Sequence, residues 1–534
     1  MAEPIRRFAR VLFPGYTNRG RSLRRLAMKM GLGSNTSGLE AYDRYLVEIE
    51  PALFLPPVRV SRGSDSPLIS VVIPFFNTPD KYLVPLLDSL SSQSFVDWEV
   101  VMADASTDAT RARRIEELSS SDSRFVYHRL AGNKGIAANT NGALERARGR
   151  FIAFADHDDT LSPHALNEVA AAVASNPTVD ILYSDEDALS EDGLTRKRPF
   201  FKPAWSPHLF LEMNYTNHLS VIRADLIREV GGLRPEMDGA QDYDLLLRLH
   251  SSAAARHVVH IPKILYHWRE AEQSTARVTG NKQYAITAGE RALTGYLNSL
   301  GIDHDGVDRP DRYPAWYRVH PRWRCRAEII VRVSADDRVN RHFAHLLDQR
   351  TSGEWVTPVV TVLTPGADLR AHRTGRDEDV VVVVDEMFLP EKADWLDELA
   401  GVLALPRTLA VAPLLLRDTR TEICNAGYVE EEGVLQPLFA GSDSQADGVT
   451  GPVDLVRNVD GLSSAVVAFR SDDCAEVDLS AGVFDGRGRA GACVVWSHVR
   501  FAGVRVPDRS GYLNGNLRSA GPAVLLRTDT GKRR

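Results

Sequence analysis

The segment FIAFADHDD, residues 151–159, joins a short apolar run to a cluster of acids. The apolar run has the length and composition of a buried strand. Asp156, Asp158 and Asp159 follow it within four residues, where their carboxylates repel one another and are costly to remove from water. A structural role would require several cations close by, and no Lys or Arg stands among the three acids. Oxygen ligands in this pattern suit Mg²⁺ or Mn²⁺, and a solvated surface loop is the alternative.

Strands and helices alternate along the chain before this segment. Apolar runs predict strands, and segments with apolar residues at helical spacing lie between them. The expected strands are 68–74, 98–102, 125–127 and 151–155, and the expected helices are 82–91, 111–119 and 137–146. Such alternation predicts an α/β fold, with βαβ units around a Rossmann-like, mostly parallel sheet. Because such sheets bind ligands at the carboxyl ends of their strands, the candidate residues are 75–77, Asp104, 132–135 and 156–159.

Length and composition exclude several classes of protein. A chain of 534 residues exceeds the size at which one core stops growing, about 250–300 residues, so two principal domains are expected. Hydrophobic residues make up 43% and charged residues 25%, which excludes wholesale disorder, collagen-like repeats and a polytopic membrane protein. The formal charge of −7 gives no basic excess for binding nucleic acid. The four cysteines lack metal-like spacing, which fits a reducing compartment.

The N-terminal segment interleaves basic and apolar residues. Within residues 1–30 the basic side chains from Arg6 to Lys29 face only Glu3 as an opposing charge, with Phe8 and Leu12 among the apolar residues between them. This pattern either holds the chain on anionic lipid or forms a solvated arm that packs on its own domain. No apolar run approaches the roughly 18–20 residues that span a bilayer, and the start lacks the apolar core of a secretory signal. We therefore expect a cytoplasmic protein, either free or peripheral on the inner face of the cell membrane.

Four further residues are candidates, each with an ordinary alternative. Asp104 closes a strand, where Asp is also a common turn residue. Asp242 opens a predicted helix in QDYDLLLR (241–248), where the helix dipole favours an acid. It becomes a candidate general base if it faces the same cleft as the acid cluster. His267 and Trp268 follow a strand-like run, 258–266, that is interrupted at Pro262. A lone His is more often structural than a ligand, and a Trp more often packs.

Several segments taken together resemble family 2 glycosyltransferases of the GT-A type, which use nucleotide-sugar donors. The resemblance covers residues 67–300, and the segments occur in order at the proper separations. They are SVVIPFFN (70–77), ADASTD (103–108), GNKGIAANTNGALERARGRFIAFADHDD (132–159), FFKPAWSP (200–207), GAQDYDLLLRL (239–249) and ILYHWRE (264–270).

The resemblance implies a role for each matching residue on the donor side. Asp104 occupies the position that hydrogen-bonds the nucleobase, and Asn77 is counted with it among the donor-binding residues. Asp156 and Asp158 match the two acids of the DxD motif, which binds the ribose and the divalent cation. Asp158 is the firmer metal ligand, because His157 stands where many relatives have a small polar residue.

Three later residues complete the implied site. Asp242 matches the catalytic base, His267 matches a histidine that completes the metal shell in some relatives, and Trp268 borders the acceptor or the diphosphate. The chemistry agrees with these roles. A cation held by Asp158 neutralises the charge that builds on the leaving diphosphate, and a carboxylate base activates the acceptor hydroxyl. One base opposite the leaving group gives a single displacement with inversion at the anomeric carbon.

From residue 326 the pattern starts again in degenerate form, which predicts a second GT-A-like domain. The residues that would bind the donor and the cation and act as the base are missing from this domain. Leu363 stands where Asp104 would fall, the acid cluster is reduced to Asp385 and Glu386, and the segment from Gly491 that should carry the base has no carboxylate. Such a domain would hold an acceptor polymer, form a dimer interface or stiffen the first domain.

The predicted organisation is a basic N-terminal arm and linker (1–66), a GT-A glycosyltransferase domain (67–300), a linker (301–325) and a degenerate GT-A-like domain (326–534). The predicted function is metal-assisted, inverting transfer of a hexosyl or deoxyhexosyl group from a UDP- or dTDP-sugar. The acceptor is a cell-surface polysaccharide, such as cell wall or O-antigen, or a lipid-linked glycan. The alternative is a catalytically silent glycan-binding or scaffold protein of the same fold. The sequence leaves open the identity of the sugar and of the acceptor. It also leaves open the oligomeric state, for which a homo-oligomer is one alternative.

Overall fold

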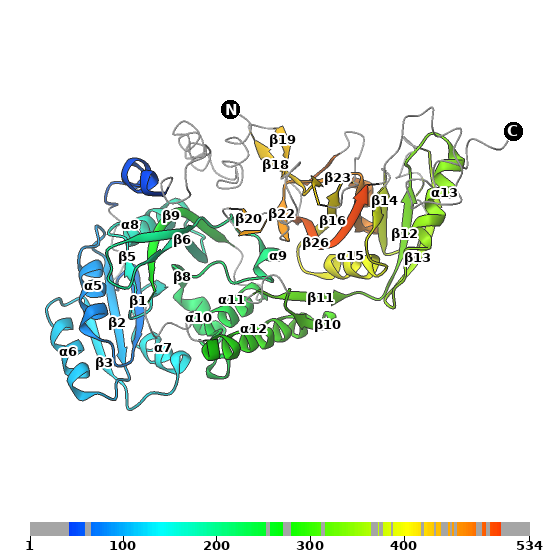
Figure 1. The fold of residues 1–534 in the computed structure, drawn as a ribbon. Helices are drawn as coiled ribbons and strands as arrows, with labels where there is room; N and C mark the ends of the chain where they lie inside the picture. Colours follow the sequence, from blue (N-terminus) through cyan, green and yellow to red (C-terminus); the bar gives the residue numbers. More distant parts are fainter. Residues whose placement is uncertain are drawn as a thin grey trace. The chain divides into compact units, whose positions relative to one another are not determined.

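The computed structural model describes residues 42–58, 66–251, 257–270, 279–310, 316–364, 372, 377–385, 388–417, 421–431, 434–438, 447–448, 451–452, 456–476, 483–486 and 492–503. These residues form two compact units, labelled by element in Figure 1. The first unit takes in the chain to Trp205, Met213–Leu300 and Asp311–Tyr317. The second takes in Ser206–Glu212, Gly301–Pro310 and the chain from Arg318 onward. The basic residues of the first thirty positions, from Arg6 to Lys29, lie outside the described residues, as do Glu386 and Gly491.

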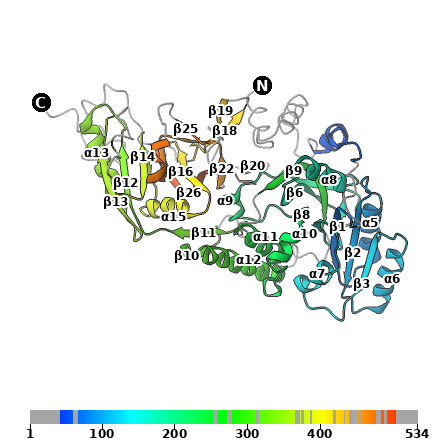
Figure 2. The same ribbon diagram turned by 180° about the vertical axis from the view of Figure 1, so that it is seen from behind.

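The sheet of the first unit begins with four parallel strands. They are β1 (Ile69–Phe75), β2 (Trp98–Asp104), β3 (Phe125–Arg129) and β4 (Phe151–Phe154), paired in the order β3-β2-β1-β4. β1 and β2 are buried almost throughout, because their β-branched side chains pack well on both faces of a covered parallel sheet. Figures 1 and 2 show α5 (Asp80–Ser91) and α6 (Ala109–Ser119) on one side of these strands and α7 (Ile136–Leu144) on the other. The predicted α/β class is confirmed.

The rest of this sheet is mixed, not mostly parallel as predicted. β8 (Ser220–Arg223) pairs antiparallel with both β4 and β6 (Ile181–Leu189), and β6 pairs parallel with β9 (Val258–Arg269). β5 (Thr160–Leu161) and β7 (Arg196–Phe200) add antiparallel edges to β9 and β6. The prediction rested on the strand–helix alternation before residue 155, and beyond β5 the chain no longer places a helix between every two strands.

β9 continues through Pro262, whereas the sequence predicted an interrupted strand that ends at residue 266. The register between β6 and β9 shifts between Ser184 and Asp185, and this irregularity takes up a proline that has no N–H to offer the ladder. His267 and Trp268 therefore lie within the strand instead of after it, with His267 opposite Thr160 of β5.

Helices complete the first unit. They are α4 (Glu50–Leu53), α8 (Ala165–Ser175), α10 (Ala224–Glu229), α11 (Gln241–Ser251) and α12 (Thr279–Ser299). α11 packs on α12 and carries Asp242 and Asp244 in its first turn, ahead of a buried leucine run. Among the described helices, none combines the length and the apolar character that crossing a membrane requires.

The second unit is built around another mixed sheet. Its strands are β12 (Cys325–Val331), β13 (Val356–Val362), β14 (Val380–Val384), β15 (Phe388–Pro390), β16 (Thr408–Leu416), β17 (Ile423–Asn425), β22 (Arg457–Val459), β24 (Val466–Arg470) and β26 (Ala492–Gly503). Its helices include α13 (Asp337–Asp348) and α15 (Trp395–Ala404). Smaller pairings flank it, formed by β10 (Asp303–Asp308) with β11 (Arg318–Arg322) and by β18 (Tyr428–Glu431) with β19 (Val434–Pro437).

The two sheets have the same strand plan. The first runs β2-β1-β4-β8-β6-β9-β5 and the second runs β13-β12-β14-β24-β16-β26-β15. Neighbouring strands in both orders pair parallel, parallel, antiparallel, antiparallel, parallel and antiparallel. Strands that hold the same place in the two orders, such as β1 and β12 or β2 and β13, also occur in the same order along the chain. A helix follows the earliest strand of each sheet, α5 after β1 and α13 after β12. Within the described residues β3 is without a counterpart in the second sheet.

A short piece of chain between β7 and β8 belongs to the second unit. It carries α9 (Pro207–Phe210), and its contacts lie within that unit. The Ser206 hydroxyl donates to Asn458 Oδ1 at 2.6 Å, His208 Nε2 is 2.8 Å from the Thr408 hydroxyl, and Glu212 Oε2 accepts from the backbone N–H of Val456 at 3.1 Å. The chain thus leaves the first unit after Trp205 and returns to it at Met213.

Gly149 gives a direct test of how closely the chain approaches β1. Its N–H donates to the Ser70 hydroxyl at 2.7 Å, and a Cβ on Gly149 would lie 2.4 Å from the Ser70 backbone nitrogen. We expect Gly149→Ala to lower the free energy of unfolding by about 1–3 kcal/mol, because β1 or β4 must shift to make room. Thermal and urea unfolding measure this. Gly132→Ala is the control, since a Cβ there meets nothing within 4 Å. Equal stabilities of the two variants would contradict the packing described.

Candidate active site

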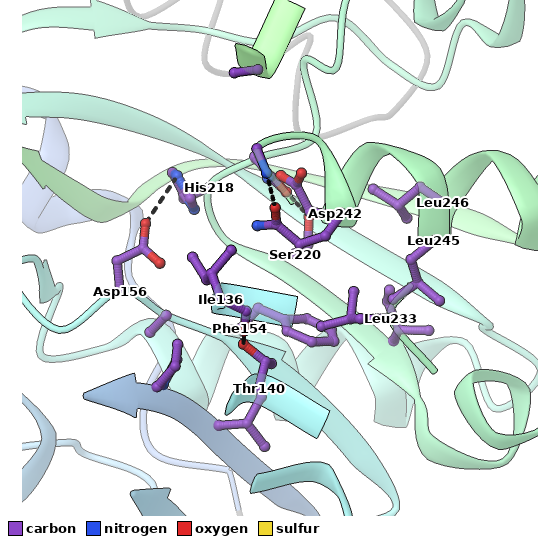
Figure 3. Close-up of a pocket in the computed structure, with 18 of the residues that line it drawn as sticks. Ile136, Thr140, Phe154, Asp156, His218, Ser220, Leu233, Asp242, Leu245 and Leu246 are labelled. Atoms are coloured by element: carbon purple, nitrogen blue, oxygen red, sulfur yellow. Dashed lines mark hydrogen bonds and ion pairs between the residues drawn. The ribbon is translucent and has the colours of Figure 1, made fainter. Parts of the chain in front are cut away.

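A cavity of about 250 Å³, the central pocket, lies in the first unit beside the end of β4 and the start of β8. Its wall has a polar side and an apolar side (Figure 3). The polar side includes Asp156, Asn217, His218, Gln241 and Asp242. The apolar side includes Ile136, Leu233, Leu245, Leu246 and Tyr284.

Asp156 and Asp242 reach this pocket from two different elements. Asp156 follows β4, and its side chain is 40% exposed. Asp242 lies in the first turn of α11, where one carboxylate oxygen accepts from the Tyr243 N–H at 2.8 Å and the other from the Asn214 amide at 3.3 Å. Burial raises the pKa of the Asp242 carboxyl, and the charge of Asp156 raises it further. The two carboxylates therefore lie close enough across the cavity for the charge of Asp156 to affect the pKa of Asp242.

Asp158 and Asp159, the other two acids of the cluster, differ in their surroundings. The Asp158 carbonyl accepts from Arg269 Nε at 2.7 Å, and burial raises the pKa of its carboxyl. Asp158 is not among the residues that line the central pocket. Asp159 is fully buried, and its carboxylate accepts from the Tyr266 hydroxyl and from the Arg269 N–H, each at 2.6 Å. This third acid joins the chain after β4 to β9.

His267 is held by a carboxylate. Its Nδ1 lies 2.6 Å from Asp187 Oδ1 on the neighbouring strand β6, and Asp187 also accepts from Arg196 Nε at 2.6 Å and from the Tyr42 hydroxyl. A carboxylate that fixes one ring nitrogen is what commonly orients a metal-ligating histidine, whose other nitrogen then faces the ion. Trp268 is partly buried and packs against the apolar core of the first unit.

Asp104 and Asn77 lie at the ends of β2 and β1, away from the residues that line the central pocket. The Asp104 carboxylate is fully buried and accepts from Ser106 N–H, the Tyr127 hydroxyl and Arg129 Nη1 at 2.8–2.9 Å. The Asn77 side-chain oxygen, Oδ1, accepts from two backbone N–H groups, those of residues 107 and 108, at 3.0 Å. Both side chains hold the loops after these strands, and their contact with a donor stays a prediction.

The acids after β4 have the donor chemistry of a magnesium or manganese site. Within the described residues no three His, Cys, Asp or Glu side chains are gathered closely enough to hold a metal by themselves. Mg²⁺, however, usually takes one or two carboxylates and completes its shell with water and substrate phosphates. Asp156 and Asp158 supply two carboxylates whose mutual repulsion a cation would relieve. The residues present therefore fit such an ion.

His218 and Asn217 line the pocket, and Asn214 binds Asp242, yet none of them was a candidate from the sequence. The sequence rule examines residues that follow parallel strands. β8 runs antiparallel to β4, so it is the start of β8 that lies at the end of β4 where the acids are found. A predicted antiparallel β8 would have brought the residues before Ser220 into consideration.

Comparison with known proteins identifies the family that part of the first unit matches. Residues 70–231 match the model of the family described as glycosyl transferase family 2. The first unit therefore contains a family 2 glycosyltransferase domain.

Particular relatives extend the likeness. The chain is 32% identical over 508 residues to the O-antigen biosynthesis protein RfbC of Myxococcus xanthus, covering 86% of this chain and 38% of the relative. It is 40% identical over 94 residues to a putative teichuronic acid biosynthesis glycosyltransferase, TuaG, of Bacillus subtilis, covering 17% and 36%. It is similar to S. aureus TarS 1–349 in complex with UDP-GlcNAc, with 21% identity, 43% and 72% coverage and a TM-score of 0.34. The chain thus spans well under half the length of the RfbC protein.

Asp159 offers a test of the join between β4 and β9. We expect Asp159→Ala to lower the free energy of unfolding by about 2 kcal/mol or more, because the Tyr266 hydroxyl and the Arg269 N–H both lose their buried acceptor. Asp159→Asn should cost less, since it keeps one acceptor oxygen and removes the repulsion from its neighbours. Chemical denaturation measures both, with Asp156→Ala as the exposed-acid control. An Asp159→Ala protein as stable as that control would show that the join is dispensable.

Proposed function

We propose that this chain transfers a sugar, with inversion, from a nucleoside-diphosphate donor to a glycan or a lipid-linked glycan of a cell-surface polysaccharide. The observation that carries the proposal is that Asp156 and Asp242, from separate elements, line one pocket of a family 2 domain. Relatives named for O-antigen and teichuronic acid biosynthesis support the class of acceptor. UDP- and dTDP-sugars are the proposed donors.

Asp242 is the proposed base. Single displacement requires one carboxylate that takes the acceptor proton as the hydroxyl attacks. The raised pKa of the Asp242 carboxyl makes its ionised form a better proton acceptor than an exposed aspartate. The Tyr243 N–H and the Asn214 amide hold its two oxygens, so the carboxylate keeps one orientation toward the pocket.

A divalent cation, Mg²⁺ or Mn²⁺, would be held by Asp158 and Asp156, with His267 as a further candidate ligand. When bound, it neutralises charge on the leaving diphosphate. The protein's own part is to keep these groups in place. Arg269 fixes the Asp158 backbone, the Tyr266 hydroxyl accepts from the Asp156 N–H at 3.0 Å, and Asp187 orients the His267 ring.

The second unit is proposed to be a degenerate copy of the same fold, without a transfer site of its own. Its shared strand plan supports the first part. Asp385, the acid directly after β14, supports the second, because Arg332 binds both of its oxygens at 2.8 Å. A guanidinium already compensates the charge of a carboxylate paired in this way, so the carboxylate gains less from binding a cation. Holding an acceptor polymer, forming a dimer and stiffening the first unit stay proposals for its role, as does lipid contact by the basic arm.

Replacing the proposed base and the proposed metal ligand tests the reaction. We expect Asp242→Asn and Asp158→Asn each to lower nucleoside-diphosphate release from donor sugar by about 10²–10⁴-fold, with the fold intact. The assay follows UDP or dTDP release from UDP-N-acetylglucosamine, UDP-glucose and dTDP-rhamnose with Mn²⁺. Asp225→Asn, at a side chain that is 63% exposed, is the control. Normal turnover by either variant would remove that residue from the mechanism. A wild-type chain that binds donors without turnover would favour the silent glycan-binding alternative.

Metal removal tests the cation separately. We expect EDTA to abolish turnover and added Mn²⁺ or Mg²⁺ to restore it, because two carboxylates alone leave the diphosphate charge without compensation. Melting curves with and without EDTA provide the control for loss of fold. Full turnover after thorough chelation would contradict the metal role of Asp158.

A further inference from the structure

His218 is held in the central pocket by its own backbone. Its N–H donates to Glu186 Oε2 at 2.5 Å, and its carbonyl accepts from Lys202 Nζ at 2.6 Å. Lys202 is 1% exposed, and its ammonium lies 3.7 Å from Glu186 Oε2. Burying an ammonium is costly unless it is paired and hydrogen-bonded. This ion pair holds both backbone polar groups of one residue, so the position of His218 is closely determined.

The ring of His218 is fixed by a second contact. It stacks on the Tyr266 ring with a centroid separation of 4.7 Å and an interplanar angle of 20°. The Tyr266 hydroxyl in turn donates to Asp159 and accepts from the Asp156 N–H. One tyrosine therefore sets both the His218 ring and the backbone of Asp156.

The separation between His218 and Asp156 suits a small group between them. His218 Nε2 lies 3.9 Å from Asp156 Oδ2, the pair drawn with a dashed line in Figure 3. That distance is too long for a direct hydrogen bond. A hydroxyl beside both atoms can accept from an imidazole N–H and donate to the carboxylate at ordinary lengths, since a hydroxyl has both capacities. Asp156 keeps its other oxygen for a cation.

The surroundings identify which hydroxyl this is. The residues lining the central pocket include Asp242, the proposed base, which must lie near the carbon that receives the acceptor. They do not include Asp104 or Asn77, the residues expected on the nucleoside side. Although the resemblance connects Asp156 with the ribose, the presence of Asp242 in the same pocket favours the transferred sugar as its occupant.

We infer that His218 and Asp156 together bind one hydroxyl of the transferred sugar, and that Glu186 and Lys202 are the positioning residues for His218. This inference rests on the proposed function. It assigns the pocket next to the base to the donor's sugar. It also gives Lys202, the buried lysine of the FFKPAWSP segment, the role of positioning His218.

Binding measurements with and without the sugar test the assignment. Calorimetric titration with Mn²⁺ compares UDP-N-acetylglucosamine, UDP-glucose and dTDP-rhamnose with UDP and dTDP. For His218→Ala we expect affinity for the bound nucleotide sugar to fall about tenfold or more, while affinity for the matching nucleoside diphosphate changes less than about twofold. His218→Gln, which keeps a donor, should recover part of the loss. His345→Ala, at an exposed histidine of the second unit, is the control and should bind like the wild type.

Lys202→Met tests the positioning role. We expect it to weaken nucleotide-sugar binding while leaving nucleoside-diphosphate binding unchanged. A merely structural lysine would instead alter both affinities together or change only the melting temperature. Lys81→Met, at a surface ion pair with a side chain 55% exposed, is its control.

Three results would overturn the inference. Unchanged nucleotide-sugar affinity in His218→Ala would exclude the contact. An equal loss with nucleoside diphosphate and nucleotide sugar would assign the hydroxyl to the ribose instead. A wild-type chain that binds none of the five compounds would overturn the proposed function and this inference with it.

Discussion

The buried carboxylate of Asp159 is the constraint on which the site depends. It accepts from the Tyr266 hydroxyl and from the Arg269 N–H, and so joins the chain after β4 to β9. Tyr266 then holds the Asp156 backbone and the His218 ring, while Arg269 holds the Asp158 carbonyl. A carboxylate can accept several hydrogen bonds at once, which is why one residue can organise so many neighbours. Asp156 and Asp158, the two acids proposed to act on the donor, are thus positioned by a third acid that is itself buried.

Much of the first unit could be predicted because its signals are local. Runs such as ISVVIPF and FIAF form strands in any covered parallel sheet, and the spacing of leucines marks α5. The direction of β8 and the passage of β9 through Pro262 could not be predicted in this way. Both depend on which strands become neighbours, and the register shift that takes up the proline exists only once β6 lies alongside. Pairing between distant segments leaves little trace in local composition.

The same division applies to the site. The acids after β4 and the acid opening α11 stand out because charged side chains next to apolar runs require a reason. His218 has no such mark. It looks like an ordinary polar residue before a short strand, and only the antiparallel course of β8 brings it to the acids. Asp104 shows the converse, because this conspicuous acid at the end of β2 is bound by Tyr127, Arg129 and a backbone N–H, and its contact with a donor stays a prediction.

The excursion of residues 206–212 into the second unit has a practical consequence for dissecting the chain. The two halves cannot be separated by one cut, because a fragment ending at Leu300 would retain Ser206, His208 and Glu212 but lose Asn458, Thr408 and the Val456 N–H that they bond. Such a fragment would lose these three hydrogen bonds only a few residues ahead of Asn214 and His218. Expressing the amino-terminal half alone would thus disturb the segment that leads to the central pocket, and inactivity of that fragment would say little about the carboxy-terminal half.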